Sequence, residues 1–481
     1  MNPRLPAAVL AAAAAVTSVA VAQDYTHPRD MNLADARPLI PDPSNYQYRL
    51  ANGLVIYIIE DPTAPLVTFT ALVRAGTAQG RRGAGAAVEQ ALRSGPANTS
   101  PAAFRQTLEE MTAAYAVSVG REITELSLNV PAEDAWQALD LLAAVLRAPR
   151  VGAPGASPQA SPGAVRQAED GPVLYEGSMP VAVRLFEDLL YGAHPFGGSV
   201  ADTDTATLTP SDVSAFHQQL FVPSNVVLAV AGDLDGADVR RRVLQTFGDW
   251  RARSAPRVAA PPSLAGGAPE RTVHTFEVDK LQGWVVMGHE LPAVPLADEA
   301  PLQVMNYILA GDHLAGRMFI EARDRRGLAN DEIGHPEPRL RGPGTYTFRA
   351  AGRPASIAPL IDVALKEIER IQNGTVTEEE LLVAKGALAD GAFVLQFRNG
   401  HSTAATLARE WAEFGDHRRS ATYRARIQAV SAAQVRAAAR KYLHPDRMQI
   451  VVLGPVAAIR ESSQPSLEAF GRVQPGTARR P

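Results

Sequence analysis

The sequence contains no cysteine among its 481 residues, and this absence removes several kinds of chemistry at once. Disulfide bridges, thiol nucleophiles, cysteine-ligated zinc and a lipid attached to an N-terminal cysteine are all excluded. Histidine is sparse as well: of the ten histidines, no two stand within five residues of each other. A pair of histidine ligands on one turn of a helix therefore cannot be drawn anywhere in the chain.

Excess charge of one sign is also absent. The chain carries 47 basic and 51 acidic residues, and its formal net charge is −4, with both signs interspersed. This pattern gives no support for a nucleic-acid partner or an acidic tail. There is no G-x-S-x-G elbow, and Gly83-Ala84-Gly85 is followed by Ala-Ala-Val, so no G-x-G-x-x-G phosphate loop is present.

The first residues have the pattern of an export signal. A positive charge at Arg4 precedes an apolar stretch from Ala7 to Val21, and Ala20-Val21-Ala22 forms a small-residue cleavage site. We therefore predict a signal peptide over residues 1–22, cleaved after Ala22, and a periplasmic or secreted protein. The alternative, a membrane helix, is disfavoured because the stretch is short, rich in alanine and lacks a stop-transfer pattern, and no other segment approaches the length of a membrane span.

A chain of this length is too long for one hydrophobic core, so two or more domains are expected. Residues 251–270 lack periodicity and are rich in Pro, Ala and Gly, which predicts a linker between domains at 45–250 and 271–460. The ends of these two segments are similar: Pro223 and Pro445, like Gly232 and Gly454, stand 222 residues apart. This indicates an α+β protein of two similar halves, the alternative being a coincidence of two common helix-strand units.

Local patterns place the main elements of the first half. Extended apolar runs cover Leu54 to Ile59 and Val67 to Val73, with a hairpin signal at Ala51-Asn52-Gly53 before them. Helices are predicted over Gly83–Pro96 and from Pro101 to Ala114, the latter with Ser100 as N-cap. The alternation from Tyr115 to Val130 predicts one or two strands. In the second half, a long helix is predicted from about Glu299 to Arg325, and a helical stretch from Glu378 to Phe414.

The predicted helix over Gly83–Pro96 carries the most specific pattern. One of its faces bears Val88, Ala91 and Leu92 and is expected to be buried. On the adjacent face Ala86, Glu89 and Gln90 stand at i, i+3 and i+4, which brings their side chains together on one turn. In the inverted zinc motif H-x-x-E-H these three places hold a histidine ligand, a general-base glutamate and a second histidine ligand. The plain alternative is a solvated glutamate on a core helix.

The order of these features resembles the insulinase/pitrilysin family of zinc peptidases, which includes the mitochondrial processing peptidase type and its non-catalytic partner subunits. The resemblance covers nearly the whole mature chain, and it rests on the helix at Gly83 together with the stretches RLANGLVIYIIED, YGAHPFGGSV, FVPSNVVLAVAGD and GRMFIEARDRRGLAN. It implies a clam-like architecture in which two halves, each an antiparallel-rich sheet with helices packed on it, enclose a chamber. In that chamber an extended peptide adds to an edge strand beside zinc.

The resemblance also assigns roles to single positions in the first half. Ala86 and Gln90 stand at the two histidine places, and Glu89 retains the general-base place. Glu176 matches the third ligand, with Glu169 seven residues before it; Gly171-Pro172 interrupts the helix between them, and two exposed acids are an equally acceptable reading.

Further positions concern the bound peptide. The substrate-binding edge strand matches at Arg121, Glu122 and Thr124, with Ala116 where active members have asparagine. In the second half, Arg323 matches the arginine that contacts the substrate and the oxyanion. Asn330 stands where active members have a tyrosine.

The replacement of both histidines, by Ala86 and Gln90, affects the ability of this helix to bind zinc. A catalytic zinc site needs three protein ligands and a water, and a carboxylate with an amide and a methyl group does not replace two imidazoles. Without a metal-polarised water, Glu89 has nothing to activate as a base. We therefore expect no cofactor, and we expect Glu89 to persist as a hydrogen-bonding group or ion-pair partner.

The sequence thus predicts an exported, non-catalytic homologue of a zinc metallopeptidase. It would act as the partner subunit of an active homologue, in a heterodimer, or as a protein that binds extended peptides, with no nucleic acid and no membrane span. The alternative is an active zinc metalloendopeptidase with an atypical site, and a third candidate is an envelope protein that binds no peptide.

Overall fold

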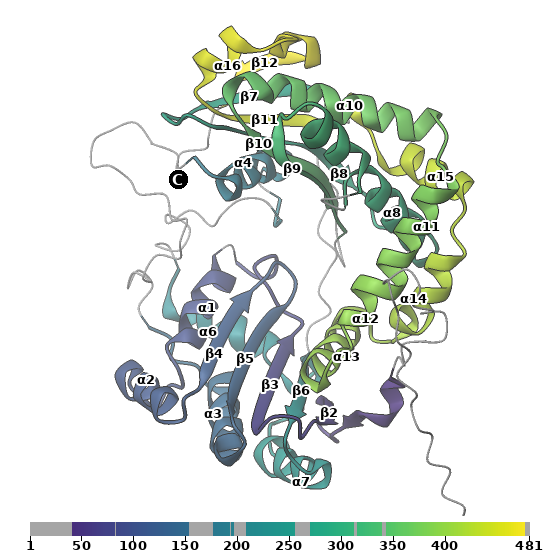
Figure 1. Ribbon diagram of the computed structural model, residues 1–481. Coiled ribbons are helices and arrows are strands. Elements are labelled where there is room, and N and C mark those ends of the chain that lie inside the picture. Colours follow the sequence, from purple (N-terminus) through teal and green to yellow (C-terminus); the bar gives the residue numbers. More distant parts are fainter. Residues whose placement is uncertain are drawn as a thin grey trace, which may run out of the picture. The chain divides into compact units, whose positions relative to one another are not determined.

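The computed structural model describes residues 41–81, 83–152, 177–192, 194–196, 208–254, 270–311, 315–338 and 343–476. Their strands form two six-stranded sheets, each with helices packed on it (Figure 1). The predicted α+β class with two similar halves is confirmed. The predicted signal peptide, most of the predicted linker, Glu169 and Glu176 lie outside the described residues.

The first sheet has the strand order β1-β2-β6-β3-β5-β4. Its strands are β1 Gln47–Arg49, β2 Val55–Glu60, β3 Leu66–Val73, β4 Ala114–Val119, β5 Thr124–Pro131 and β6 Val226–Gly232. Only β2 and β6 run parallel; the other neighbours are antiparallel. The predicted hairpin at Ala51-Asn52-Gly53 joins β1 to β2.

The second sheet has the order β12-β7-β11-β8-β10-β9, in which the five strands from β7 to β9 repeat the order of β2 to β4 in the first sheet. The sixth strand differs, because β12 follows the others in the chain and runs parallel to β7, whereas β1 precedes β2 and runs antiparallel to it. The strands of the second sheet are β7 Thr272–Glu277, β8 Gly283–Leu291, β9 Ala329–Glu337, β10 Gly344–Gly352, β11 Gln449–Gly454 and β12 Arg472–Pro475. The similarity between the ends of the two halves is therefore architectural, because β6 and β11 occupy the same place in their sheets. β12 lies beyond residue 460, where the predicted second domain ends.

The last residue of this repeated strand shows why the sequence pattern recurs. Gly232 and Gly454 have φ angles of 145° and 159°, a region that side chains other than glycine rarely adopt. At Gly232 a Cβ atom would lie 2.1 Å from the carbonyl oxygen of Leu66. Both conformation and space therefore require glycine at Gly232, and the conformation requires it at Gly454.

Helices of its own half cover one face of each sheet, and one helix of each half packs instead on the sheet of the other half. Those of the first region are α1 Ala84–Arg93, α2 Pro101–Glu110, α3 Ala135–Arg147, α4 Met179–Tyr191, α6 Pro210–Leu220 and α7 Gly236–Phe247. Those of the second are α8 Leu296–Asn306, α9 Arg317–Phe319, α10 Ile357–Asn373, α11 Glu378–Gly386, α12 Phe393–Leu395, α13 Gly400–Phe414, α14 Arg418–Gln428, α15 Ala432–Tyr442 and α16 Val456–Ser462. Alternate strand residues face this helical layer and form the two main cores.

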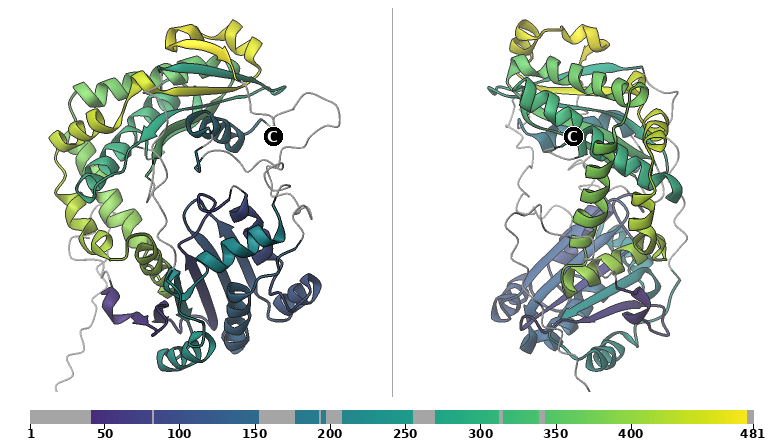
Figure 2. Two further views of the ribbon diagram at one scale, coloured as in Figure 1. Left: turned by 180° about the vertical axis from the view of Figure 1, so that it is seen from behind. Right: turned by 45° about the vertical axis from the view of Figure 1, so that its right-hand side comes forward.

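Two helices pack on the sheet of the other half. Helix α13 covers the second face of β2, β3 and β6 (Figures 1 and 2). There Leu407 and Ala408 form one buried cluster with Tyr57 and Ala229. Helix α4 covers the corresponding face of β8 and β11, where Phe186 packs in the same way. Packing thus crosses the predicted domain boundary in both directions.

The C-terminus of α13 is held by a side chain of the first sheet. Arg74, which follows β3, donates from Nε to the carbonyl of Ala412 and from Nη2 to that of Trp411, both at 2.7 Å. Carbonyls in the last turn of a helix have no intrahelical partner, so a cation placed there is stabilising.

We expect Arg74→Ala to lower the free energy of unfolding by about 2–4 kcal/mol, because two charge-assisted hydrogen bonds are lost. Denaturant unfolding measures this, with Arg105→Ala as control, since Arg105 is an exposed arginine on α2. Equal stability of the two variants would show that Arg74 does not hold α13.

The prediction of one long helix from Glu299 to Arg325 is wrong. Helix α8 passes into a π-helical turn, Tyr307–Gly311, and the next helix starts only after Gly316, which has extended backbone angles. The stretch from Glu378 is divided before α13, where Asn399 caps a new helix through the amide of Ser402. A glycine and a strong N-cap residue end a helix locally even where the apolar pattern continues.

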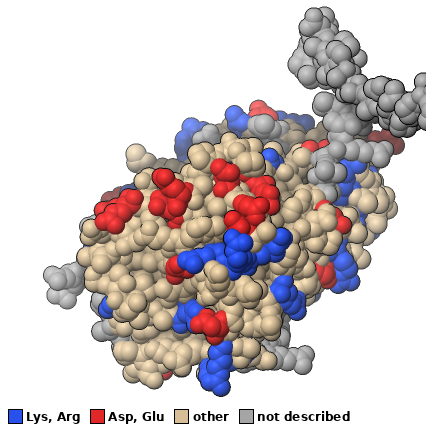
Figure 3. All heavy atoms as spheres, turned by 90° about the horizontal axis from the view of Figure 1, so that it is seen from below, with Lys and Arg blue, Asp and Glu red and all other residues tan. Residues whose placement is uncertain are grey.

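The distribution of charge on the surface and the length of the helices are the last two features of the fold. On the face seen in Figure 3, acidic and basic residues lie close together among uncharged ones, in keeping with ion pairs such as Arg147–Asp249 and Arg241–Asp238. Among the helices of the described residues, none has the length and apolarity required to cross a membrane.

Candidate functional site

Helix α1 forms as its pattern predicts. Val88, Ala91 and Leu92 are buried against the first core, and the helix begins after Gly83, whose φ is 86°. It ends before Gly95, where a Cβ atom would lie 2.5 Å from the ring of Phe104. The helix is therefore fixed in rotation and length by the core.

The face next to the core carries the three motif positions. Ala86, Glu89 and Gln90 are all partly exposed on α1. Glu89 accepts from Arg93, one turn later, with its Oε1 2.7 Å from Nη2 and 3.1 Å from Nε. The same Nη2 also donates to the main-chain carbonyl of Val117 in β4. The carboxylate at the general-base position is thus engaged in an ion pair.

The strand beside this face is β4, which lies at the end of the first sheet. Ala114, Ala116 and Ser118 are exposed on one of its faces, while Val117 is buried in the core on the other. Tyr115 donates from its hydroxyl to the carbonyl of Leu92 at 3.0 Å and ties the strand to α1. Ala116, at the place of the expected asparagine, is on this end strand.

The other predicted peptide-binding residues lie next to β4. Arg121 and Glu122 are in the turn between β4 and β5, and Thr124 starts β5, which has neighbours on both sides. Thr124 is fully buried, and its hydroxyl donates to the carbonyl of Ala75 at 2.7 Å. Arg121 pairs with Glu187 of α4 at 2.6 Å. Although burial disfavours its charge, this pairing raises the pKa of the Arg121 guanidinium. Their role in peptide binding stays a prediction.

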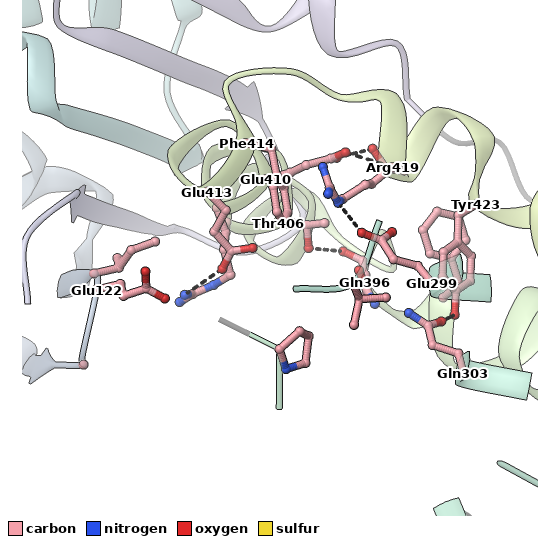
Figure 4. Close-up of a pocket in the computed structure, with 18 of the residues that line it drawn as sticks. Glu122, Glu299, Gln303, Gln396, Thr406, Glu410, Glu413, Phe414, Arg419 and Tyr423 are labelled. Carbon is pink, nitrogen blue, oxygen red and sulfur yellow. Dashed lines mark hydrogen bonds and ion pairs between the residues drawn. The ribbon is translucent and has the colours of Figure 1, made fainter. Parts of the chain in front are cut away.

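This turn also lines a cavity of about 920 Å³ together with residues of α8, α13 and α14 (Figure 4). Most of its charged groups pair with one another: Glu299 contacts Arg419 at 2.8 Å and Arg426 at 3.3 Å. Burial raises the pKa of the Glu413 carboxyl, and the neighbouring Glu122 raises it further, against the lowering effect of arginines that include Arg409. No sequence pattern indicates this cavity, because its walls come from segments far apart in the chain.

In the second half, Arg323 and Asn330 lie in two different secondary-structure elements. Arg323 is exposed in a π-helical segment, with its guanidinium carbon 4.9 Å from the centre of the Phe319 ring. It lines a cleft of about 540 Å³ with Leu281 and Arg353. Asn330 belongs to β9, an end strand of the second sheet, and its side chain is outside the described residues.

The sequence of this chain is similar to those of known peptidases. The family model described as "Peptidase M16 inactive domain" matches residues 207–388. An uncharacterized zinc protease of Mycobacterium leprae is 28% identical over 280 residues, which cover 57% of this chain and 61% of that protein. One of Streptomyces coelicolor is 28% identical over 282 residues, covering 56% of this chain and 60% of that protein. Residues 207–388 of this chain are therefore similar to a domain of the M16 peptidase family. The match spans about three fifths of these relatives' length.

Two solved structures are similar to this chain in fold. The crystal structure of a peptidase M16 inactive domain from Pseudomonas fluorescens has a TM-score of 0.69 and 21% identity, covering 85% of this chain and 98% of that one. A protease from Helicobacter pylori has a TM-score of 0.66 and 17% identity, with the same coverage.

The residues on α1 of this chain do not fit zinc. Ala86 offers a methyl group and Gln90 an amide, and the carboxylate between them is paired with Arg93. Zinc in proteins is bound by imidazole, thiolate or carboxylate groups. Within the described residues, no three histidine, aspartate or glutamate side chains converge as metal ligands. The donor groups on α1 therefore support no catalytic step through a metal.

Arg93 is a residue of this site that was not predicted from the sequence. Its position four residues after Glu89 is the spacing of a helical ion pair, and this signal is present in the sequence. Its second contact, to Val117, could not be foreseen, because it depends on how α1 packs beside β4.

Proposed function

We propose that this chain is a non-catalytic M16 protein that acts by binding extended peptides. The observation that carries the proposal is the state of Glu89. A general base must accept a proton from a polarised water, but this carboxylate is paired with Arg93 and flanked by Ala86 and Gln90. The binding part of the proposal is supported by β4, an end strand with small exposed side chains.

Peptide binding at β4 follows from the geometry of sheets. A strand at the end of a sheet presents main-chain donors and acceptors on its open side, and an extended peptide satisfies them by adding as a further strand. Small residues such as Ala114, Ala116 and Ser118 leave room over one face. Selectivity for sequence is then expected to be low, because main-chain hydrogen bonds supply most of the affinity.

Two cellular roles are compatible with such binding. The chain acts either as the partner subunit of an active M16 peptidase or as a peptide-binding protein by itself, after export with cleavage at Ala22. The pattern of residues 1–22 supports export. An active peptidase with an atypical site is the rival proposal, and an envelope protein without peptide binding is the third.

Metal content separates the first two proposals. We expect the purified mature protein to hold no stoichiometric zinc and to leave unstructured peptides uncleaved, since two ligands are replaced. Elemental analysis and a fluorogenic peptide assay measure this, with the M. leprae relative as a parallel sample. One tightly held zinc per chain, with chelator-sensitive cleavage that Glu89→Gln abolishes, would establish the rival.

A further inference from the structure

The open side of β4 can be assigned residue by residue. The turn to β5 is closed by a hydrogen bond from the amide of Gly120 to the carbonyl of Ile123, at 2.9 Å. In an antiparallel pair, hydrogen-bonded and non-hydrogen-bonded positions alternate. Counting back along the register, Ser118 and Glu125 form a hydrogen-bonded position, and Val117 and Leu126 do not. The amide and carbonyl of Val117 therefore point away from β5, toward the open side.

This outward carbonyl of Val117 is covered by the protein itself. The Nη2 of Arg93 donates to it, and the same nitrogen contacts Glu89 Oε1 at 2.7 Å. Glu89 is held by the core-packed helix α1, so the guanidinium is fixed between an anchored carboxylate and the strand. Both side chains remain partly exposed, at 49% for Arg93 and 31% for Glu89. An arriving peptide can therefore reach them.

We propose that Arg93 and Glu89 form a latch over the open side of β4, which a peptide strand must displace in order to bind. This inference rests on the proposed peptide binding at β4. An added strand would bring its own amide to the carbonyl of Val117, and two donors cannot both take the position in the plane of the new sheet. Part of the gain from strand addition is then offset by the loss of the contact between Arg93 and Val117.

The latch predicts that removing the guanidinium tightens peptide binding. A charge-assisted hydrogen bond contributes an amount that corresponds to about tenfold in affinity, so Arg93→Ala should lower the Kd by about tenfold. Arg93→Met should do the same while keeping an unbranched side chain of similar length, which guards against a folding defect in the alanine variant. Glu89→Ala leaves Arg93 in place but unanchored, and a smaller gain is expected.

The experiment uses the mature chain and a short fluorescein-labelled peptide of alternating Thr and Val with a lysine at each end. Fluorescence anisotropy gives the Kd, and amide hydrogen exchange reports whether residues 114–119 become protected on binding. Arg105→Ala is the matched control, because Arg105 is an exposed arginine on the next helix, α2, and should bind as the unsubstituted protein does.

The outcomes separate the latch from the function on which it rests. Tighter binding by Arg93→Ala and Arg93→Met, with protection of residues 114–119 in every bound form, supports the latch. Equal or weaker binding by both variants, with the same protection, overturns it and leaves peptide binding intact; weaker binding would mean that Arg93 contacts the peptide instead. No binding and no protection in any variant would overturn the proposed function together with the latch.

Discussion

Replacing Ala86 and Gln90 together by histidine is expected to create a zinc site on α1. The two positions lie on one partly exposed face of a helix whose rotation is fixed by Val88 and Leu92, so both imidazoles would project from the same turn. Two imidazoles with a carboxylate form a common zinc ligand set. Since neither residue now present is a zinc ligand, the double variant should bind zinc at least about a thousandfold more tightly than the unsubstituted chain, as judged by competition with a chromogenic chelator.

The single variants are the controls for this experiment. Ala86→His or Gln90→His alone supplies one imidazole and should gain far less affinity than the pair. Adding Glu176→Gln or Glu169→Gln to the double variant tests the third ligand, because only the true ligand should reduce zinc affinity. If the double variant folds, as judged by circular dichroism, and still binds no zinc, the alignment of α1 with the zinc helix is wrong.

Much of the fold is predictable because it depends on local patterns. The runs at β2 and β3, the helix α1, and the alternation of β4 and β5 follow from periods of two and 3.6 residues, which the core imposes directly. The repeat is visible for a related reason. A glycine that must adopt a positive φ, as at Gly232 and Gly454, remains readable in the sequence.

The exchanged helices α4 and α13 are not predictable from the sequence. An apolar stripe indicates that a helix will be buried, but it does not say against which surface. Leu407 and Ala408 would satisfy either sheet by their hydrophobicity alone. The partner is fixed by tertiary contacts such as that of Arg74 with the last carbonyls of α13, which joins residues far apart in the chain.

The candidate site, like the fold, is predictable from the sequence in part only. The positions of Ala86, Glu89 and Gln90 on one face follow from helical spacing, and the expectation that Glu89 serves as an ion-pair partner agrees with its contact to Arg93. The location of Arg121 and Glu122 in a turn depends on where β4 ends. Matching a motif to the sequence does not show where β4 ends, because Arg121 and Glu122 could equally well belong to a strand.

A contribution of this chain to a partner's reaction is the second large effect that we expect. In the proposed heterodimer, an active M16 homologue should cleave unstructured peptides faster in the presence of this protein. Arg323 is exposed, and its guanidinium lies over the ring of Phe319. A group that stabilises a developing oxyanion acts through its position alone, so it can be supplied by another chain.

Arg323→Ala should therefore reduce the accelerated rate by about a hundredfold, in line with the loss of one oxyanion donor, while the complex still assembles. Steady-state cleavage measures the rate, and size-exclusion chromatography measures assembly. Arg353→Ala is the matched control, because Arg353 is exposed in the same cleft of about 540 Å³ but lies outside the matched motif. Equal losses in both variants would indicate a general electrostatic effect of the cleft. An active homologue that is fully competent alone and does not associate at micromolar concentration would rule out the partner role and leave peptide binding by the single chain.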